Sequence, residues 1–266
     1  MSCNRVAIIG GGNLGAAVAE GILKMQVLEA DKLYITRRRT HQLNHLKERG
    51  VNVLPSNVDA AAACDLIILA IKPYQVVDVI KEIKPALTAQ KTLVSLVSGV
   101  SSEVLQKAAG SDIPVFRAMP NTAIGLGQSM TCISFDKPWA DRLPVVEELF
   151  NQLGETAVIN EELMAAATVL GSCGIAFALR FMRAAMQGGI EIGFSAEMAQ
   201  LITAQTMKGA SELILSSKAH PEREIDRVTT PMGITISGLN EMEHQGFSSS
   251  LIQGLITSYR KIEKSK

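Results

Sequence analysis

The chain has 266 residues, of which 47% are apolar and 20% charged, so it is long enough for one large or two ordinary globular domains. This composition excludes global disorder. Lysine plus arginine equals aspartate plus glutamate at 26 each, which leaves no net basic field to attract a nucleic acid. The sequence therefore predicts a globular protein that does not bind nucleic acid.

The four cysteines, Cys3, Cys64, Cys132 and Cys173, are widely scattered, and none belongs to a C-x-x-C or Cys/His cluster. A metal cage or a disulfide framework needs closer spacing, so we predict no bound metal and reduced thiols. The first residues run directly into an apolar segment that predicts a strand, which leaves no room for a signal peptide. We therefore expect a cytoplasmic protein.

Short apolar runs alternate with helical patterns over residues 1–160, as in βαβ units. Several runs are continuous Val/Ile/Leu, which is typical of strands in a parallel sheet with both faces buried. The strands are predicted over Val6–Gly10, Lys32–Thr36, Val51–Leu54, Leu66–Ala70, Thr92–Val97, Val115–Ala118, Thr131–Phe135 and Thr156–Ile159. The helices between them are predicted over Leu14–Met25, Thr40–Arg49, Asn57–Ala63, Pro73–Lys84, Ser102–Ala109 and Trp139–Leu153. This part of the chain is predicted to be an α/β domain.

After about residue 160 the strand pattern ends, so residues 161–266 predict a second, all-helical domain. Its helices are predicted over Leu163–Gln187, Ala196–Ser217, Glu222–Val228, Ile236–Gln245 and Ser250–Glu263. The first two are apolar around most of their circumference, which is too hydrophobic for a helix with one face in water. The stretch Leu163–Leu179 is too short and too polar for a membrane span. We therefore predict buried helices with no membrane insertion, covered by a partner chain in a dimer.

The segment Gly10–Gly15 fits G-x-G-x-x-G directly after the first predicted strand, at the start of a predicted helix. Gly10 would allow the tight turn, Gly12 would let the backbone approach a pyrophosphate, and Gly15 would let the helix pack on the strand. The anion would lie against the helix N-terminus. The segment therefore predicts a dinucleotide-binding Rossmann domain. The alternative is a glycine-rich turn of purely structural use.

The second predicted strand ends in Thr36-Arg37-Arg38-Arg39, where NAD-binding proteins normally carry an acid. A carboxylate there would repel a 2′-phosphate, whereas guanidinium groups pair with a phosphate in a bidentate manner. The arginines therefore predict NADPH (NADP) as the cofactor rather than NADH. The alternative is a solvated basic turn.

Seven segments, in this order along the chain, resemble the pyrroline-5-carboxylate reductases, which carry out the last step of proline synthesis. They are Gly10–Gly15, Asn57 with the alanines after it, Ala70–Pro73, Ser95–Val100, Arg117–Thr122, Gly171–Phe177 and Thr230–Thr235. The resemblance runs from end to end. It implies an N-terminal Rossmann domain, a helical domain that interlocks with a second subunit, and reduction of 1-pyrroline-5-carboxylate to L-proline. The substrate site would lie where the nicotinamide of one subunit meets helices at the dimer interface.

The resemblance, together with the position of each segment at a strand end, implies a set of cofactor-binding residues. They are Ile9, Gly10, Gly12, Asn13, Leu14, Gly15, Thr36, Arg37, Arg38, Asn57, Ala70, Ile71, Lys72, Pro73, Val97, Met119 and Asn121. We expect Ala70–Pro73 to contact the cofactor through the backbone, and the role of the Lys72 side chain is left open. The expected partners are a small-molecule substrate and further copies of the chain, in a homodimer or a higher homo-oligomer.

The resemblance also implies a substrate loop ahead of a predicted helix, made of Pro231, Met232, Gly233, Ile234 and Thr235. Backbone N–H groups there can receive the substrate carboxylate. Thr235 is the predicted catalytic residue, because its hydroxyl can hydrogen-bond the ring nitrogen and orient the imine without fully donating a proton. The alternative is that Thr235 caps the helix. The sequence departs from the family at Met232, where the family has glycine, and at Ile175, where it has proline.

Two other functions stay open on the sequence. The β-hydroxyacid dehydrogenases share the two-domain plan but use a lysine on the long interdomain helix as a base. The corresponding stretch Gly171–Arg180 offers only an arginine, which cannot act as that base near neutral pH. The β-hydroxyacid dehydrogenases and the reductases of other cyclic imines stay open as alternative functions. The alternative that is not an enzyme is a regulator that binds NADP(H) without catalysis. It stays open because Met232 and Ile175 depart from the family pattern.

Overall fold

The computed structural model describes residues 4–264, which divide into two compact units. The first contains residues 4–173 together with 259–264, and the second is Gly174–Ser258. The first unit thus continues past residue 160, the domain boundary that the sequence suggests.

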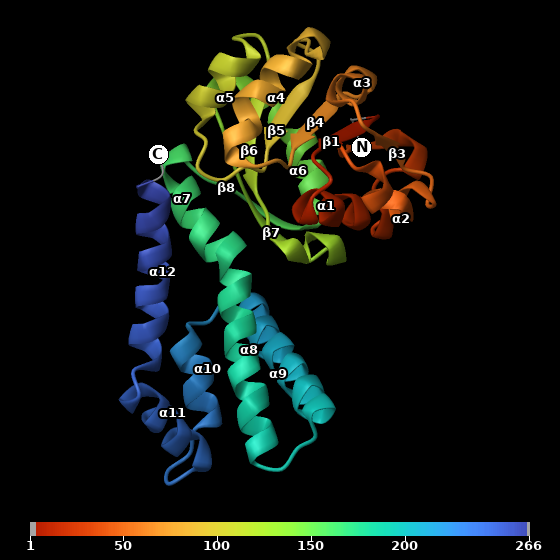
Figure 1. Cartoon of the computed structure of the whole chain (residues 1–266). Coiled ribbons are helices and arrows are strands. Elements are labelled where there is room, and N and C mark those ends of the chain that lie inside the picture. The colour runs from red at the N-terminus through yellow and green to blue at the C-terminus, as the bar shows by residue number, and fades with distance from the viewer. Residues whose placement is uncertain (1–3, 265–266) are drawn as a thin grey trace. The chain divides into compact units, whose positions relative to one another are not determined.

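The first unit contains one sheet of eight strands, and each predicted strand is present (Figure 1). The strands are β1 (Val6–Ile9), β2 (Leu33–Thr36), β3 (Asn52–Leu54), β4 (Leu66–Leu69), β5 (Thr92–Ser95), β6 (Val115–Met119), β7 (Ser129–Phe135) and β8 (Gly154–Val158). Their order is β3-β2-β1-β4-β5-β6-β7-β8. All neighbours are parallel except β6 and β7, which pair antiparallel. The sheet is therefore parallel, as predicted, except at this pair, where the short link through the 3-10 turn Thr122–Leu126 leaves no room for a crossover helix.

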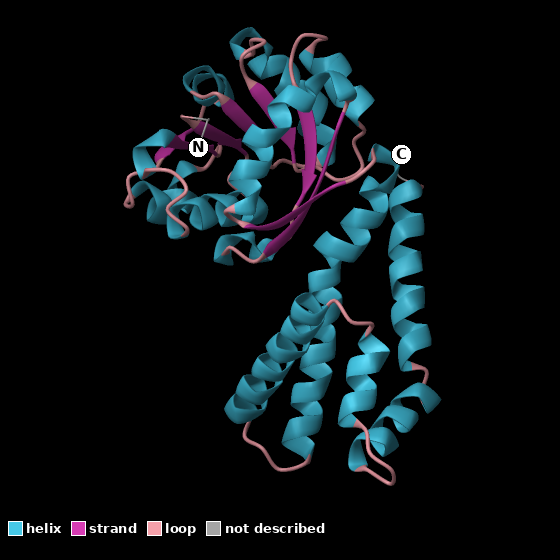
Figure 2. Ribbon diagram, turned by 180° about the vertical axis from the view of Figure 1, so that it is seen from behind, coloured by secondary structure: helices cyan, strands magenta, loops and turns pink. Residues whose placement is uncertain are grey.

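Helices cover both faces of this sheet, as Figure 2 shows. They are α1 (Asn13–Lys24), α2 (Asn44–Lys47), α3 (Asn57–Ala63), α4 (Val76–Ile83), α5 (Ser102–Ala109), α6 (Leu143–Asn151) and α7 (Met164–Ala167). Side chains alternate along a strand, so β1 sends Val6 and Ile8 into one core cluster, with α1, α2 and α6. It sends Ala7 and Ile9 into the other, with α3, α4 and α5. Each of these four side chains is fully buried. This double burial explains the continuous apolar runs in the sequence.

The second unit is all helical, as predicted. It contains α8 (Gly174–Glu191), α9 (Ala196–Ser217), α10 (Pro221–Val228), α11 (Ile234–His244) and most of α12 (Phe247–Glu263). Helices α8 and α9 run side by side as a hairpin (Figures 1 and 2). A Cβ atom at Gly189 would lie only 3.1 Å from the Cβ of Ala199, so the small residues bring the two helices close together. The rings of Phe181 and Phe247 meet edge to face, with centroids 6.0 Å apart.

One continuous helical segment, Glu161–Glu191, runs from the first unit into the second. It contains a π-helical turn at Thr168–Cys173, between α7 and α8. By length and composition it is the one helix among residues 4–264 that could cross a membrane. The sequence predicts a buried helix here. Within one copy of the chain only its beginning is buried, at Met164, Ala165, Thr168 and Val169.

Candidate active site

The glycine-rich loop has the geometry that each of its three motif glycines predicts. Gly10 has a φ of +109°, and a Cβ there would lie 2.6 Å from the Ala70 carbonyl oxygen. A Cβ at Gly15 would collide with the carbonyl oxygen of Gly10. In contrast, nothing lies within 4 Å of the position of a Cβ at Gly12. The loop therefore needs glycine at two positions for its own fold and leaves open space at the third.

The N-terminus of α1 lies next to this open space. Gly12 is the N-cap, no side chain caps the helix, and its first turn has no acidic residue. The N–H groups of Asn13, Leu14 and Gly15 have no acceptor within the helix, because they belong to its first turn. Together with the helix dipole they can hold an anion, so these residues fit the pyrophosphate of a dinucleotide.

A chain of hydrogen bonds fixes the loop to the strand beside it. The buried hydroxyl of Thr36 accepts a hydrogen bond from the Gly10 N–H at 3.2 Å and donates to Asn57 Oδ1 at 2.7 Å. The Asn57 amide donates in turn to Glu82 Oε2 at 3.1 Å. The Gly11 N–H donates to the Thr36 carbonyl oxygen at 2.7 Å. Thr36 and Asn57 therefore hold the loop in place, whatever contact they make with a ligand.

The arginines after β2 differ in their surroundings. Arg37 is half-buried, and its Nη1 donates to the Gly11 carbonyl oxygen at 2.6 Å. Arg38 and Arg39 are exposed. The Arg37 guanidinium thus lies against the glycine-rich loop and keeps further donors for a ligand. No carboxylate stands at the end of β2, so the site fits a ribose that carries a 2′-phosphate.

The segments after β1, β4 and β5 meet at the carboxyl edge of the sheet. The Ala70 N–H donates to the Ile9 carbonyl oxygen, and the Leu96 N–H donates to the Leu69 carbonyl oxygen, each at 2.9 Å. Strand order reverses between β1 and β4, which is where open α/β sheets bind their ligands. The predicted cofactor residues of these segments therefore share one edge.

The predicted cofactor residues at this edge differ in how exposed their side chains are. The side chains of Val97 and Met119 are each 3% exposed, which leaves only their backbone to face a cofactor. Ile71 is half-buried, and Lys72 and Pro73 are exposed. Pro73 begins a 3-10 turn, in agreement with its predicted place at a helix start.

The side chain of Asn121 is engaged with the protein at both ends. Its Oδ1 accepts from the Ala123 N–H at 3.0 Å, and its Nδ2 donates to the Gly171 carbonyl oxygen at 3.2 Å. Its own N–H donates to the Ser129 hydroxyl at 3.1 Å. The structure thus gives Asn121 a structural task that the sequence did not suggest, and a cofactor contact stays a prediction.

The predicted substrate loop, Pro231–Thr235, belongs to the second unit, and α11 begins within it at Ile234, two residues before the predicted helix start at Ile236. Met232 has a φ of +61° and a fully exposed side chain. It therefore takes the left-handed conformation that glycine favours, at a cost of about 1–3 kcal/mol, and the turn survives the substitution. Gly233 is the N-cap of α11, and the exposed Thr235 lies in the first turn. The alternative that Thr235 caps the helix is therefore wrong.

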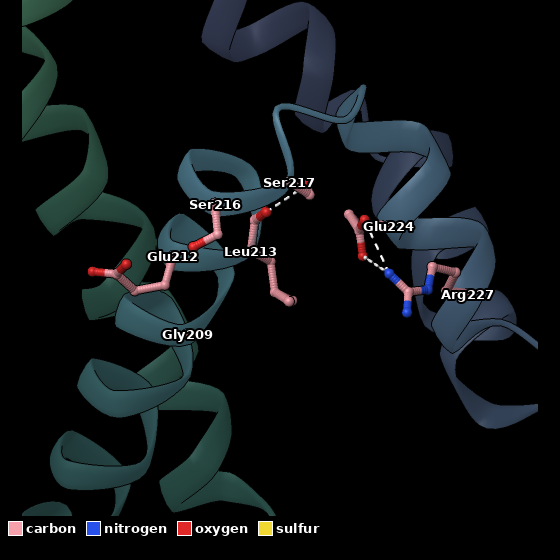
Figure 3. A pocket seen from close by; sticks show the side chains of 7 residues that line it. All are labelled: Gly209, Glu212, Leu213, Ser216, Ser217, Glu224 and Arg227. Carbon is pink, nitrogen blue, oxygen red and sulfur yellow. Dashed lines mark hydrogen bonds and ion pairs between the residues drawn. The ribbon is translucent and has the colours of Figure 1, made fainter.

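A cavity of about 330 Å³ lies between α9 and α10, and Figure 3 shows it. Its lining residues are Gly209, Glu212, Leu213, Ser216, Ser217, Glu224 and Arg227. Arg227 Nη1 donates to Glu224 Oε2 at 2.9 Å. None of the predicted site residues lines this cavity.

Comparison with known proteins identifies the family. The family model for pyrroline-5-carboxylate reductase dimerisation matches residues 161–265, and that for NADP oxidoreductase, coenzyme F420-dependent, matches residues 5–99. Pyrroline-5-carboxylate reductase 2 of Dictyostelium discoideum is 42% identical over 98% of this chain and 93% of its own length. The chain belongs to the pyrroline-5-carboxylate reductase family. Reductase 1 of the same organism is 44% identical over 97% of this chain, which spans only 49% of that protein.

Solved structures of the family have the same fold. Plasmodium falciparum pyrroline carboxylate reductase, solved with NADP bound, matches with a TM-score of 0.88 and 26% identity over 98% of this chain and 97% of that chain. The enzyme of Streptococcus pyogenes matches with a TM-score of 0.85 and 27% identity over 98% of each chain. The chain is therefore an oxidoreductase with a Rossmann domain and a helical domain, and the dimerisation match supports self-association.

Proposed function

We propose that the chain reduces 1-pyrroline-5-carboxylate to L-proline with NADPH. The observation that carries this proposal is the glycine-rich loop, which is open at Gly12 and has Arg37 against it, in a chain of this family. The open loop supports a bound dinucleotide, and the arginine supports the 2′-phosphate that distinguishes NADP from NAD.

We propose the following assignment of the cofactor residues. The first turn of α1 holds the pyrophosphate, Arg37 and Arg38 hold the 2′-phosphate, and the backbone after β4, from Ala70 to Pro73, lines the site beyond the loop. When bound, NADPH supplies the hydride. The protein fixes the cofactor through groups that are already in place, because hydrogen bonds at Thr36 and Asn57 hold the loop rigid.

For the substrate, we propose that the free N–H groups at the start of α11 receive its carboxylate. The Thr235 hydroxyl hydrogen-bonds the ring nitrogen and orients the imine carbon toward the hydride. A cyclic imine can take its proton from water, so the protein does not need a strong acid. Orientation and exclusion of water then supply most of the acceleration.

We further propose a homodimer as the active form, in the cytoplasm. Large apolar side chains of the second unit are exposed in a single copy, among them Leu201 and Leu215 of α9, at 62% and 67%. Soluble monomers rarely expose apolar patches of this kind, so a second copy is the natural cover. Subcellular fractionation tests the location.

The deciding experiment mixes the purified protein with NADPH and pyrroline-5-carboxylate, follows NADPH oxidation and identifies the product. Stoichiometric L-proline is the expected result. Tight NADPH binding with no turnover would favour a silent regulator. Oxidation of a β-hydroxyacid with NADP, in the absence of imine reduction, would favour the dehydrogenase alternative. Faster turnover of another cyclic imine would mean that the reaction is as proposed but the substrate is different.

A further inference from the structure

An ion pair between a buried arginine and a half-exposed glutamate ties the start of the connecting helix to the sheet. Arg117 lies within β6, its side chain is 7% exposed, and its Nη1 donates to Glu161 Oε1 at 2.6 Å. A buried charge is costly unless it is paired and hydrogen-bonded. The Arg117 Nε atom has no acceptor among the described residues, so part of that cost remains.

Glu161 accepts further hydrogen bonds from two other elements. Its Oε2 accepts from the Ser134 hydroxyl of β7 at 2.7 Å and from the Ser102 hydroxyl of α5 at 2.9 Å. Its Oε1 also accepts from the Ser102 N–H at 3.1 Å. Ser102 and Ser134 are buried. One carboxylate is therefore fixed by donors from β6, β7 and the N-terminal turn of α5.

A second contact anchors the same segment at its other end. Gly171 lies in the π-helical turn, and its carbonyl oxygen accepts from the Asn121 side chain. Such turns are frequent at functional sites and shift the register of the helix that follows. Between the two anchors, Met164, Ala165 and Val169 are buried. Residues 161–171 are thus held on the first unit by directional contacts at both ends.

We infer that Glu161 is a positioning residue for the reaction. Held by Arg117, Ser102 and Ser134, it fixes the register of the connecting helix, and thereby of Gly171, whose carbonyl oxygen holds the side chain of Asn121, a predicted cofactor residue. This inference rests on the proposed function. An ion pair with one half-exposed partner contributes little net stability, whereas its directional bonds fix one geometry. Misplacement by about 1 Å far from the chemistry can cost a hundredfold in rate.

A double variant separates positioning from stability. Arg117→Met with Glu161→Leu replaces the ion pair by an apolar pair that fills similar space. We expect a lower melting temperature, because the buried Ser102 and Ser134 donors lose their acceptor. At a temperature where the variant is folded, the NADPH dissociation constant should stay within about twofold of the parent's, and kcat with pyrroline-5-carboxylate should fall about tenfold or more. A folded double variant with parent-like kcat and KM would overturn the inference.

Two further variants keep the test decisive if the double variant does not fold. Ser134→Ala removes one donor and keeps the ion pair, and we expect a smaller loss of kcat with unchanged NADPH affinity. Glu162→Gln changes the exposed neighbour of Glu161 and is the matched control, expected to be parent-like. Equal kcat in Ser134→Ala and the control would also overturn the inference. A parent protein that does not turn over the substrate would instead refute the proposed function.

Discussion

The two units of this chain differ in how far their apolar side chains are buried within one copy. In the first unit the strands β1 and β4 are completely buried, because helices of the same chain cover both faces of the sheet. Among residues 174–258, Ala199 is the only apolar residue that is fully buried. Both units are rich in apolar residues, so the amount of hydrophobicity does not explain the difference. The first unit is complete within one chain, whereas the second presents apolar faces that another copy can cover.

The largest effect is expected from a charge on the exposed apolar surface of α9. Leu215→Glu would bury an unpaired carboxylate in a dimer interface, at a cost of about 3–5 kcal/mol, and so weaken dimerisation about 100-fold or more. Light scattering and activity over a concentration series measure this. Leu126→Glu is the control, because Leu126 is 61% exposed and lies in the first unit. A fully active monomeric parent would refute the proposed dimer.

The next effect concerns the second unit's proposed contact with the substrate. Thr235→Val keeps the shape of the side chain and removes one hydrogen bond, so kcat should fall about tenfold or more. The melting temperature should barely change, because Gly233 caps α11. Ser237→Ala is the control on the same helix, since that hydroxyl donates to the Gly233 carbonyl oxygen at 3.2 Å. If kcat of Thr235→Val matches that of the parent, Thr235 does not orient the substrate, and the proposed substrate site consists of the backbone N–H groups at the start of α11.

A comparable effect on selectivity is expected in the first unit. The parent should prefer NADPH over NADH at least about tenfold in kcat/KM, because a charge-assisted contact contributes about 1.5–3 kcal/mol. Replacing Arg37 and Arg38 with serine should remove most of this preference. Arg37→Ser alone should also raise the KM for NADH, because Arg37 supports the loop at Gly11. Arg38→Ser alone should affect only NADPH. Equal use of both cofactors by the parent would contradict the assignment.

The smallest effect is a pH dependence confined to the first unit. Burial raises the pKa of Glu161, but the hydrogen bonds from Ser134, Arg117 and Ser102 and the charge of Arg117 outweigh it, so the pKa lies below its ordinary value of 4.5. The unfolded chain therefore takes up the proton first as the pH falls. This contribution to stability is complete above the ordinary value and is lost as the pH falls through the lowered pKa.

Melting temperatures between about pH 5 and pH 3 check this sign. The parent should lose stability more steeply than Glu161→Gln, whereas Glu162→Gln should follow the parent. Parallel curves for the parent and Glu161→Gln would show that this carboxylate does not titrate with folding.

Local signals in the sequence were enough to predict most elements and the cofactor loop. The predicted bounds of α3, α5 and α9 agree with the structure. Each of these helices follows an N-cap serine whose side chain accepts a hydrogen bond from the first turn, and these serines are Ser56, Ser101 and Ser195. The glycine spacing predicted the geometry of the loop for a similar reason. A side chain at Gly15 would collide with the nearby Gly10 carbonyl, and one at Gly10 would collide with Ala70 at the end of the adjacent strand, so the motif itself determines these contacts.

The features that the sequence did not predict depend on residues far apart in the chain. The antiparallel β7, the Asn121 contact with the π-helical turn, and the pairing of Arg117 with Glu161 have no periodic pattern or short motif. The apolar composition of α8 and α9 indicated a partner, but only the structure showed which side chains one copy leaves exposed. Hydrophobic periodicity and capping are local and can be read from neighbouring residues, whereas buried polar pairs form only when the fold brings distant segments together.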